Sequence, residues 1–282
     1  MKRRLLWAAL AVGLAWVLTV AGASFIYIQR LLHPGCSAAA AEQPGYLSVT
    51  IPSGSLRLAG WWRAPHNGAV VLLMGGHGAG RDAMLAEANL LAQRGFGILA
   101  VEQRSCTGEL ATLGYREADD FRAMADFAQR QPGVERLGAV GFSAGGAAVL
   151  LAAARDPRLA AVVAEGNYAN LYDEMTASAA PLLSLEWQID RFCALFYSLV
   201  TGVWAGDVSP VDAAAKIGPR AVFFIHGERE IERSRGQKQY TAAVQPRQLW
   251  IVPNAGHGDY LSAAPQEYPR RLVEFFEMYL LV

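Results

Sequence analysis

Residues 137–154 read LGAVGFSAGGAAVLLAAA, and this stretch decides the fold. The apolar run over 137–142 predicts a buried strand, and the alanine-rich run over 144–154 predicts a helix directly after it. Ser143 lies between them in a G-x-S-x-G pattern. A serine on a sharp strand-to-helix turn needs very small residues two positions to either side, because the backbone there leaves no room for a Cβ. Gly141 and Gly145 meet that need, so Ser143 is a candidate nucleophile. The alternative is a Gly-Ser loop that merely starts a helix.

Buried strands alternate with helices on both sides of this stretch. The alternation predicts right-handed crossovers and an α/β fold, with a mostly parallel sheet and helices on both faces. Ligands of such folds bind at the carboxyl ends of the strands. We expect strands over 46–51 and 56–62, as a hairpin, and over 69–74, 96–101, 137–142, 159–164, 221–225 and 248–252. We expect helices over 82–93, 117–130, 144–154 and 266–281.

A serine nucleophile needs a base within hydrogen-bond reach. His257 is the candidate, because it lies in a glycine-flanked loop just after the last predicted strand. His226 also ends a strand, but it is joined directly to Gly227, and we interpret it as packing that turn. His33 and His66 follow no buried strand and are expected at the surface.

A carboxylate is needed to orient the base, and three glutamates are candidates. Glu228 and Glu230 follow the penultimate predicted strand, and Glu165 follows an earlier one. The chain order nucleophile, acid, histidine is the order expected for a serine at such a turn. Glu230 fits best, and Glu228 and Glu165 stay open as alternatives.

Several stretches together resemble the α/β-hydrolase superfamily, particularly bacterial membrane-anchored members of the serine aminopeptidase-like and acyl-esterase branch. The resemblance covers about residues 46–282. It rests on Gly75-Gly76-His77-Gly78-Ala79-Gly80-Arg81, Glu117-Ala118-Asp119-Asp120, the turn at Ser143, His226-Gly227-Glu228-Arg229-Glu230 and Gly256-His257-Gly258. Two positions depart from the family pattern: relatives usually have an aspartate where Glu230 stands, and commonly His-Gly where this chain has Gly75-Gly76.

The resemblance implies an α/β-hydrolase fold with an eight-stranded sheet and a helical cap inserted over about residues 171–209. It implies acyl transfer through Ser143, His257 and Glu230, with the backbone amides of His77 and Ala144 as the oxyanion hole. The departure at Gly75-Gly76 is tolerable, because backbone groups are the donors there. The implied chemistry needs no metal and no organic cofactor, and the expected substrate is a small acyl compound.

The substrate cannot be narrowed further from the residues. Six aromatic residues of the cap region are as suited to a packing core as to an apolar substrate: Tyr172, Trp187, Phe192, Phe196, Tyr197 and Trp204. Ester, thioester and amide bonds all remain open. A non-catalytic hydrolase-fold scaffold that binds a ligand or protein is the alternative class, although the serine, acid and histidine are all present in order.

The N-terminal residues predict a membrane anchor over 1–30. Lys2, Arg3 and Arg4 precede an uncharged run over 5–28, which as a helix is long enough to cross a hydrocarbon core of about 30 Å. The basic flank predicts a cytoplasmic N-terminus and an exported remainder. The alternative is a secreted protein whose signal peptide is cut after the small-x-small pattern at 21–23. A linker over 31–45 is expected to join this segment to the folded domain over 46–282.

Composition limits the remaining possibilities. Of the 282 residues, 53% are hydrophobic and 18% charged, and the formal net charge is zero, so the chain is no disordered segment and has no basic footprint for nucleic acid. The first 30 residues carry an excess of basic groups, and the remainder is mildly acidic. Three cysteines, Cys36, Cys106 and Cys193, show no metal-ligand spacing, so we expect neither a disulfide framework nor a zinc site. The oligomeric state is not indicated.

Overall fold

A computed structural model describes residues 2–37, 42–177 and 180–281, and it contains an eight-stranded sheet in the order β1-β2-β4-β3-β5-β6-β7-β8. The strands are β1 Leu47–Ser53, β2 Leu56–Arg63, β3 Ala69–Met74, β4 Gly97–Val101, β5 Arg136–Phe142, β6 Leu159–Glu165, β7 Ala221–Gly227 and β8 Arg247–Val252. β1 and β2 form the expected hairpin, β2 runs antiparallel to β4, and the remaining pairs are parallel. This architecture confirms the predicted fold class.

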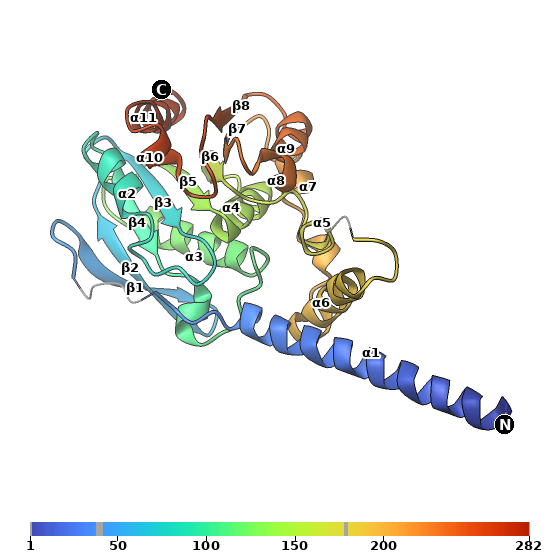
Figure 1. Cartoon of the computed structure of the whole chain (residues 1–282). Coiled ribbons are helices and arrows are strands. Elements are labelled where there is room, and N and C mark those ends of the chain that lie inside the picture. Colours follow the sequence, from blue (N-terminus) through green and yellow to red (C-terminus); the bar gives the residue numbers. More distant parts are fainter. Residues whose placement is uncertain (1, 38–41, 178–179, 282) are drawn as a thin grey trace.

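Helices cover both faces of the sheet (Figure 1). α3 (Glu117–Gln129), α4 (Ala144–Arg155) and α7 (Pro210–Ala214) pack on one face, while α2 (Leu85–Ala92) and α11 (Glu267–Leu280) pack on the other. Shorter helices α8 (Ile231–Ser234), α9 (Gly236–Ala242) and α10 (Tyr260–Ala263), and the 3-10 turn η1 (Arg104–Thr107), lie in the connections. Because the central strands are covered on both sides, they read as continuous apolar runs; β3 and β4 are buried at every position.

The long connection between β6 and β7 carries the cap. It contains α5 (Leu171–Met175), the 17-residue α6 (Leu185–Thr201) and the 3-10 turn η2 (Ala205–Asp207). Ser184 caps α6, because its hydroxyl accepts a hydrogen bond from the amide of Trp187 at 3.2 Å. The cap lies on the side of the molecule from which α1 projects (Figure 1).

α1 (Lys2–Leu32) is the one helix in the described ranges that is long and apolar enough by itself to cross a membrane. Its N-terminal half projects away from the domain, and its C-terminal half lies beside α6 (Figure 1). The buried residues Val20, Ser24, Ile28 and Leu32 repeat every four positions, which places them on one face of the helix. The helix ends at Leu32, two residues beyond the predicted end of the anchor at residue 30.

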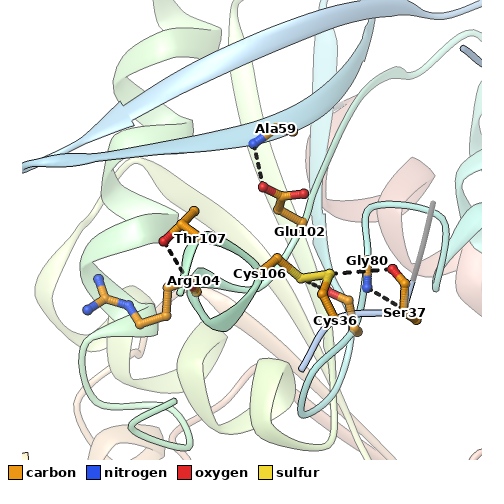
Figure 2. Close-up of a disulfide and its surroundings, with 9 residues drawn as sticks. Cys36, Ser37, Ala59, Gly80, Glu102, Arg104, Cys106 and Thr107 are labelled. Atoms are coloured by element: carbon orange, nitrogen blue, oxygen red, sulfur yellow. Dashed lines mark hydrogen bonds between the residues drawn. A yellow bond between two sulfur atoms is a disulfide. The ribbon is translucent and has the colours of Figure 1, made fainter. Parts of the chain in front are cut away.

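The structure departs from the sequence-based expectation that the cysteines form no disulfide. Cys36 and Cys106 form a disulfide with a Cα–Cα distance of 4.8 Å, and Cys193 is free and buried (Figure 2). The two half-cystines are 70 residues apart in the sequence, and no local spacing marks them as a pair. They meet because the chain leaving α1 packs against the loop after β3 and the turn after β4. There the backbone amide of Ser37 donates a hydrogen bond to the carbonyl oxygen of Gly78. The side-chain hydroxyl of Ser37 accepts one from the backbone amide of Gly80.

Candidate active site

Ser143 sits on a tight turn at the carboxyl end of β5, with φ 55° and ψ −115°. A positive φ is rare for a residue with a Cβ, and the surrounding packing holds it there. A Cβ on Gly141 would lie 2.0 Å from the carbonyl oxygen of Gly145, and a Cβ on Gly145 would lie 2.3 Å from that of Met74. Both glycines are thus required by close backbone approach, as the sequence predicted.

Three of the predicted site residues form one hydrogen-bonded chain. His257 Nε2 lies 3.1 Å from Ser143 Oγ, and His257 Nδ1 lies 2.6 Å from Glu230 Oε2. They come from the loop after β8, the turn after β5 and the turn after β7, which lie at the same edge of the parallel sheet, with β6 between β5 and β7. The ring of Phe142 packs at 4.7 Å from the His257 ring and limits its orientation. This arrangement allows His257 to accept a proton from Ser143.

Glu230 is held by more than the histidine. Its Oε1 accepts hydrogen bonds from the Gly227 amide at 2.9 Å and from the Tyr260 hydroxyl. Burial raises the pKa of Glu230, but hydrogen bonds from His257, Tyr260 and Gly227 favour the charged form and leave the pKa below its usual value. Glu230 is therefore a carboxylate at neutral pH. Tyr260 was missed in the sequence, because it lies beyond the His257 loop and no motif includes it.

The other two glutamates are occupied elsewhere. Glu228 accepts a hydrogen bond from the Asn254 amide at 2.8 Å. Glu165 is buried and accepts one from the Tyr268 hydroxyl at 2.8 Å. His226 is fully buried against Ser234, and burial lowers its pKa to about 4, so it stays neutral. This agrees with its interpretation as a packing residue.

The loop after β3 brings its backbone against the nucleophile. A Cβ on Gly76 would lie 3.1 Å from the Cβ of Ser143, so this loop passes directly over the serine. His77 follows, and Ala144 is the first residue of α4; among the described residues neither amide donates a hydrogen bond to a backbone or side-chain acceptor. Two unpaired amides beside Ser143 are suited to bind a negatively charged oxygen. The His77 ring itself turns away, with Nε2 at 2.6 Å from the carbonyl oxygen of Leu31 in α1.

A cavity of about 1020 Å³ opens over Ser143. The loops at the carboxyl ends of the strands contribute its floor, with His77, Ser143 and His257. The cap contributes residues of α5 and α6, and α1 contributes Tyr27, Ile28 and Leu31. The contribution of α1 was not foreseen, because the sequence showed only an apolar run and a linker at that point.

Among the residues that the structure describes, one group has side chains of metal-binding type close together, namely Cys36, Cys106 and Glu102. Both sulfur atoms are already joined in the disulfide, and Glu102 accepts the Ala59 amide at 3.0 Å (Figure 2). This donor set does not fit a thiolate-held metal ion, which needs free deprotonated thiols.

Comparison with known proteins places this fold and site in a family. The model of the Alpha/beta hydrolase family matches residues 70–275, and the chain belongs to that family. Among curated proteins, the uncharacterized protein PA2218 of Pseudomonas aeruginosa is 25% identical, and the match covers 68% of this chain and 68% of that protein.

Solved structures share the fold. The esterase Pf2001 of Pyrococcus furiosus superposes with a TM-score of 0.67 at 20% identity, covering 87% of this chain and 99% of that one. The structure of PA2218 superposes at 0.64 with 23% identity, covering 86% and 99%. The dienelactone hydrolase of Anabaena variabilis superposes at 0.60 with 20% identity, covering 85% and 100%. These neighbours share the fold, and membership of the Alpha/beta hydrolase family supports a hydrolase.

Proposed function

We propose that this protein is a serine hydrolase that cleaves an ester, thioester or amide bond of an acyl substrate. The observation that carries the proposal is the hydrogen-bonded chain from Ser143 through His257 to Glu230. Ser143 attacks the substrate carbonyl while His257 takes its proton, and Glu230 stabilises the charged imidazole. The amides of His77 and Ala144 bind the oxyanion. His257 then protonates the leaving group, and water releases the acyl group from Ser143 by the same steps in reverse.

Labelling with a fluorophosphonate probe tests the nucleophile. We expect the wild-type protein to be labelled and Ser143→Ala to lose labelling, while Ser55→Ala, a change at an exposed turn serine, keeps it. Labelling of the Ser143→Ala variant at the wild-type level would contradict the proposal. Absence of labelling in the folded wild type, together with ligand binding at the cavity, would instead favour a non-catalytic scaffold.

We further propose that α1 anchors the protein with its N-terminus in the cytoplasm and the hydrolase domain outside it. The flank of Lys2, Arg3 and Arg4 supports this orientation, and so does the disulfide Cys36–Cys106, since disulfides persist in oxidising compartments. Retention of α1 is supported by Val20, which precedes the alternative cleavage site and is buried in the folded protein. Mass spectrometry of the mature protein tests retention: a chain beginning at Ser24 would contradict it.

A further inference from the structure

The cap helix α6 runs alongside the proposed membrane anchor. Trp16 Nε1 of α1 donates to Gln188 Oε1 of α6 at 3.1 Å, and farther along, the rings of Phe25 and Phe196 meet edge to face at 5.4 Å. The two helices therefore run in the same direction over this stretch, with Val20 and Ser24 of α1 buried between the two contacts. The N-terminal end of α6 thus points back along α1 toward the membrane.

The depth of α6 follows from the position of the basic flank. A span that begins directly after Arg4 needs about 20 residues to cross a core of about 30 Å, so it ends near Ser24. At 1.5 Å per residue, Trp16 then lies about 12 Å inside the outer boundary of the core. Gln188 contacts Trp16, so the first turn of α6 lies at the same depth. The outer half of the bilayer therefore surrounds both helices.

The surface of α6 agrees with this depth. Three leucines at its N-terminal end are exposed, Leu182 at 74%, Leu183 at 68% and Leu185 at 47%, and none of them lines the cavity. Leu195 and Leu199 continue an exposed apolar surface along the helix. Residues 205–214, which follow α6 after a bend of 83°, are packed in the protein core, so the exposed apolar surface is confined to α6 and the leucines before it.

Both of these helices line the cavity over Ser143. Ile28 and Leu31 of α1 and Ile189 of α6 give it apolar walls suited to an acyl chain. The acidic residues of α6 at this level, Glu186 and Asp190, line the cavity and so avoid the cost of contact with lipid, and Arg191 packs over the rings of Tyr172 and Trp187. Acidic groups outnumber basic ones around the cavity, which disfavours an anionic headgroup. The lining acids are Glu174, Glu186, Asp190 and Glu230, and the lining bases are Arg229 and Arg233.

From these observations, and resting on the proposed function, we propose that the substrate is an uncharged long-chain acyl ester that enters the cavity from the outer leaflet between α1 and α6. In this arrangement α6 and the leucines before it open a path from the bilayer to Ser143. An acylglycerol has this chemistry. The ester bond is hydrolysed by Ser143 and water, and yields a fatty acid and the alcohol.

The first experiment separates access from catalysis. The triple variant Leu182→Ser, Leu183→Ser, Leu185→Ser is reconstituted as full-length protein in phosphatidylcholine vesicles containing a monoacylglycerol. We expect hydrolysis of that lipid to fall about tenfold or more, because three apolar side chains lose lipid contact. Hydrolysis of p-nitrophenyl butyrate, which reaches the cavity from water, stays at the wild-type level.

The matched control carries the same chemical change at exposed apolar residues away from the cap, namely Leu47→Ser, Val244→Ser and Met278→Ser. It should leave both activities unchanged. Equal rates of monoacylglycerol hydrolysis in the cap triple and the control would overturn the inference while the serine-hydrolase proposal stands. Loss of probe labelling in the wild type would instead overturn the proposed function, and the inference with it.

A second measurement needs no catalysis. Leu183→Cys, labelled with a bimane fluorophore in the full-length protein, should be quenched by phosphatidylcholine brominated on its acyl chains. The same label at Leu47→Cys should not be quenched. Equal quenching at the two positions, or none at either, would overturn the placement of α6 in the bilayer.

Discussion

Glu230 accepts three hydrogen bonds with its one carboxylate. One oxygen reaches His257, while the other accepts the Gly227 amide and the Tyr260 hydroxyl. The extra methylene, relative to the aspartate that the family resemblance led us to expect, is accommodated by these contacts. The side chain is fixed from both ends, so the proposed base is held in one orientation.

The neighbouring glutamates give a matched test of this role. Glu230→Gln should reduce kcat by about 10²- to 10⁴-fold, because a neutral amide no longer stabilises the charged imidazole or sets its tautomer. Glu228→Gln makes the same chemical change two residues away, and its side-chain oxygen can still accept the Asn254 amide. We expect near wild-type turnover for it. Steady-state kinetics on a soluble ester, with melting temperatures as a check on folding, would show the reverse pattern if Glu228 were the acid.

Those site residues could be predicted from the sequence whose positions follow from chain order or from the spacing of glycines. Ser143, His257 and Glu230 were ranked first from their positions after strands, and the structure brings them together. Tyr260 and Leu31 were not found. Their contacts depend on how a loop and a helix end pack in space, and no spacing in the sequence records that.

At the scale of elements, β6, α2 and α11 meet around a buried acidic cluster. The Tyr268 hydroxyl lies 2.8 Å from Glu165 and 3.1 Å from Glu87, and one hydroxyl proton serves only one of them at a time. Burial raises the pKa of Glu165 well above its usual value, and the charge of Glu87 raises it further. The Tyr268 hydrogen bond opposes these effects only in part. The folded structure therefore disfavours ionisation of Glu165.

This cluster makes stability depend on pH in a defined direction. Because the pKa of Glu165 is raised in the folded state, its contribution to stability is complete below the unfolded value near 4.5 and is lost as pH rises through the folded pKa. Glu165→Gln stays neutral, so its free energy of unfolding should fall less than that of the wild type between pH 5 and pH 8. Urea unfolding at several pH values measures this. Glu109→Gln, at an exposed carboxylate, is the control; a parallel fall in all three proteins would contradict the prediction.

The order of elements was well predicted, and the errors lie at their ends. All eight expected strands form, because buried strands and amphipathic helices differ in hydrophobic period. The helix expected over 82–93 begins only at Leu85, after a turn. The contact of α1 with α6 had no signal in the sequence, since a uniformly apolar helix does not reveal which face packs against protein and which against lipid.

At the scale of the whole molecule, the disulfide joins the end of the anchor helix to the loops around the site. Cys36→Ala, Cys106→Ala and the double variant should each lower the free energy of unfolding by about 4 kcal/mol, the chain-entropy value for a loop of this length. The three variants should agree, because each removes the same bond. Urea unfolding of the detergent-solubilised protein measures this, and reductant should bring the wild type to the same value. The prediction would be contradicted if the double variant lost the sum of the two single losses in free energy of unfolding, or if reductant left the wild-type value unchanged.

In the proposed membrane-anchored topology, the disulfide also determines how the folded domain can be released from the membrane. It closes a ring that contains residues 37–105, so a protease that cuts anywhere within that ring leaves the domain covalently attached to α1 through Cys36. Cleavage in the segment around 38–41, where the predicted linker lies, does not shed the enzyme. Release requires a cut between the membrane and Cys36, or a cut within the ring followed by reduction. In that topology two covalent connections hold the domain to α1, namely the backbone and the disulfide, and the disulfide survives a cut within the ring.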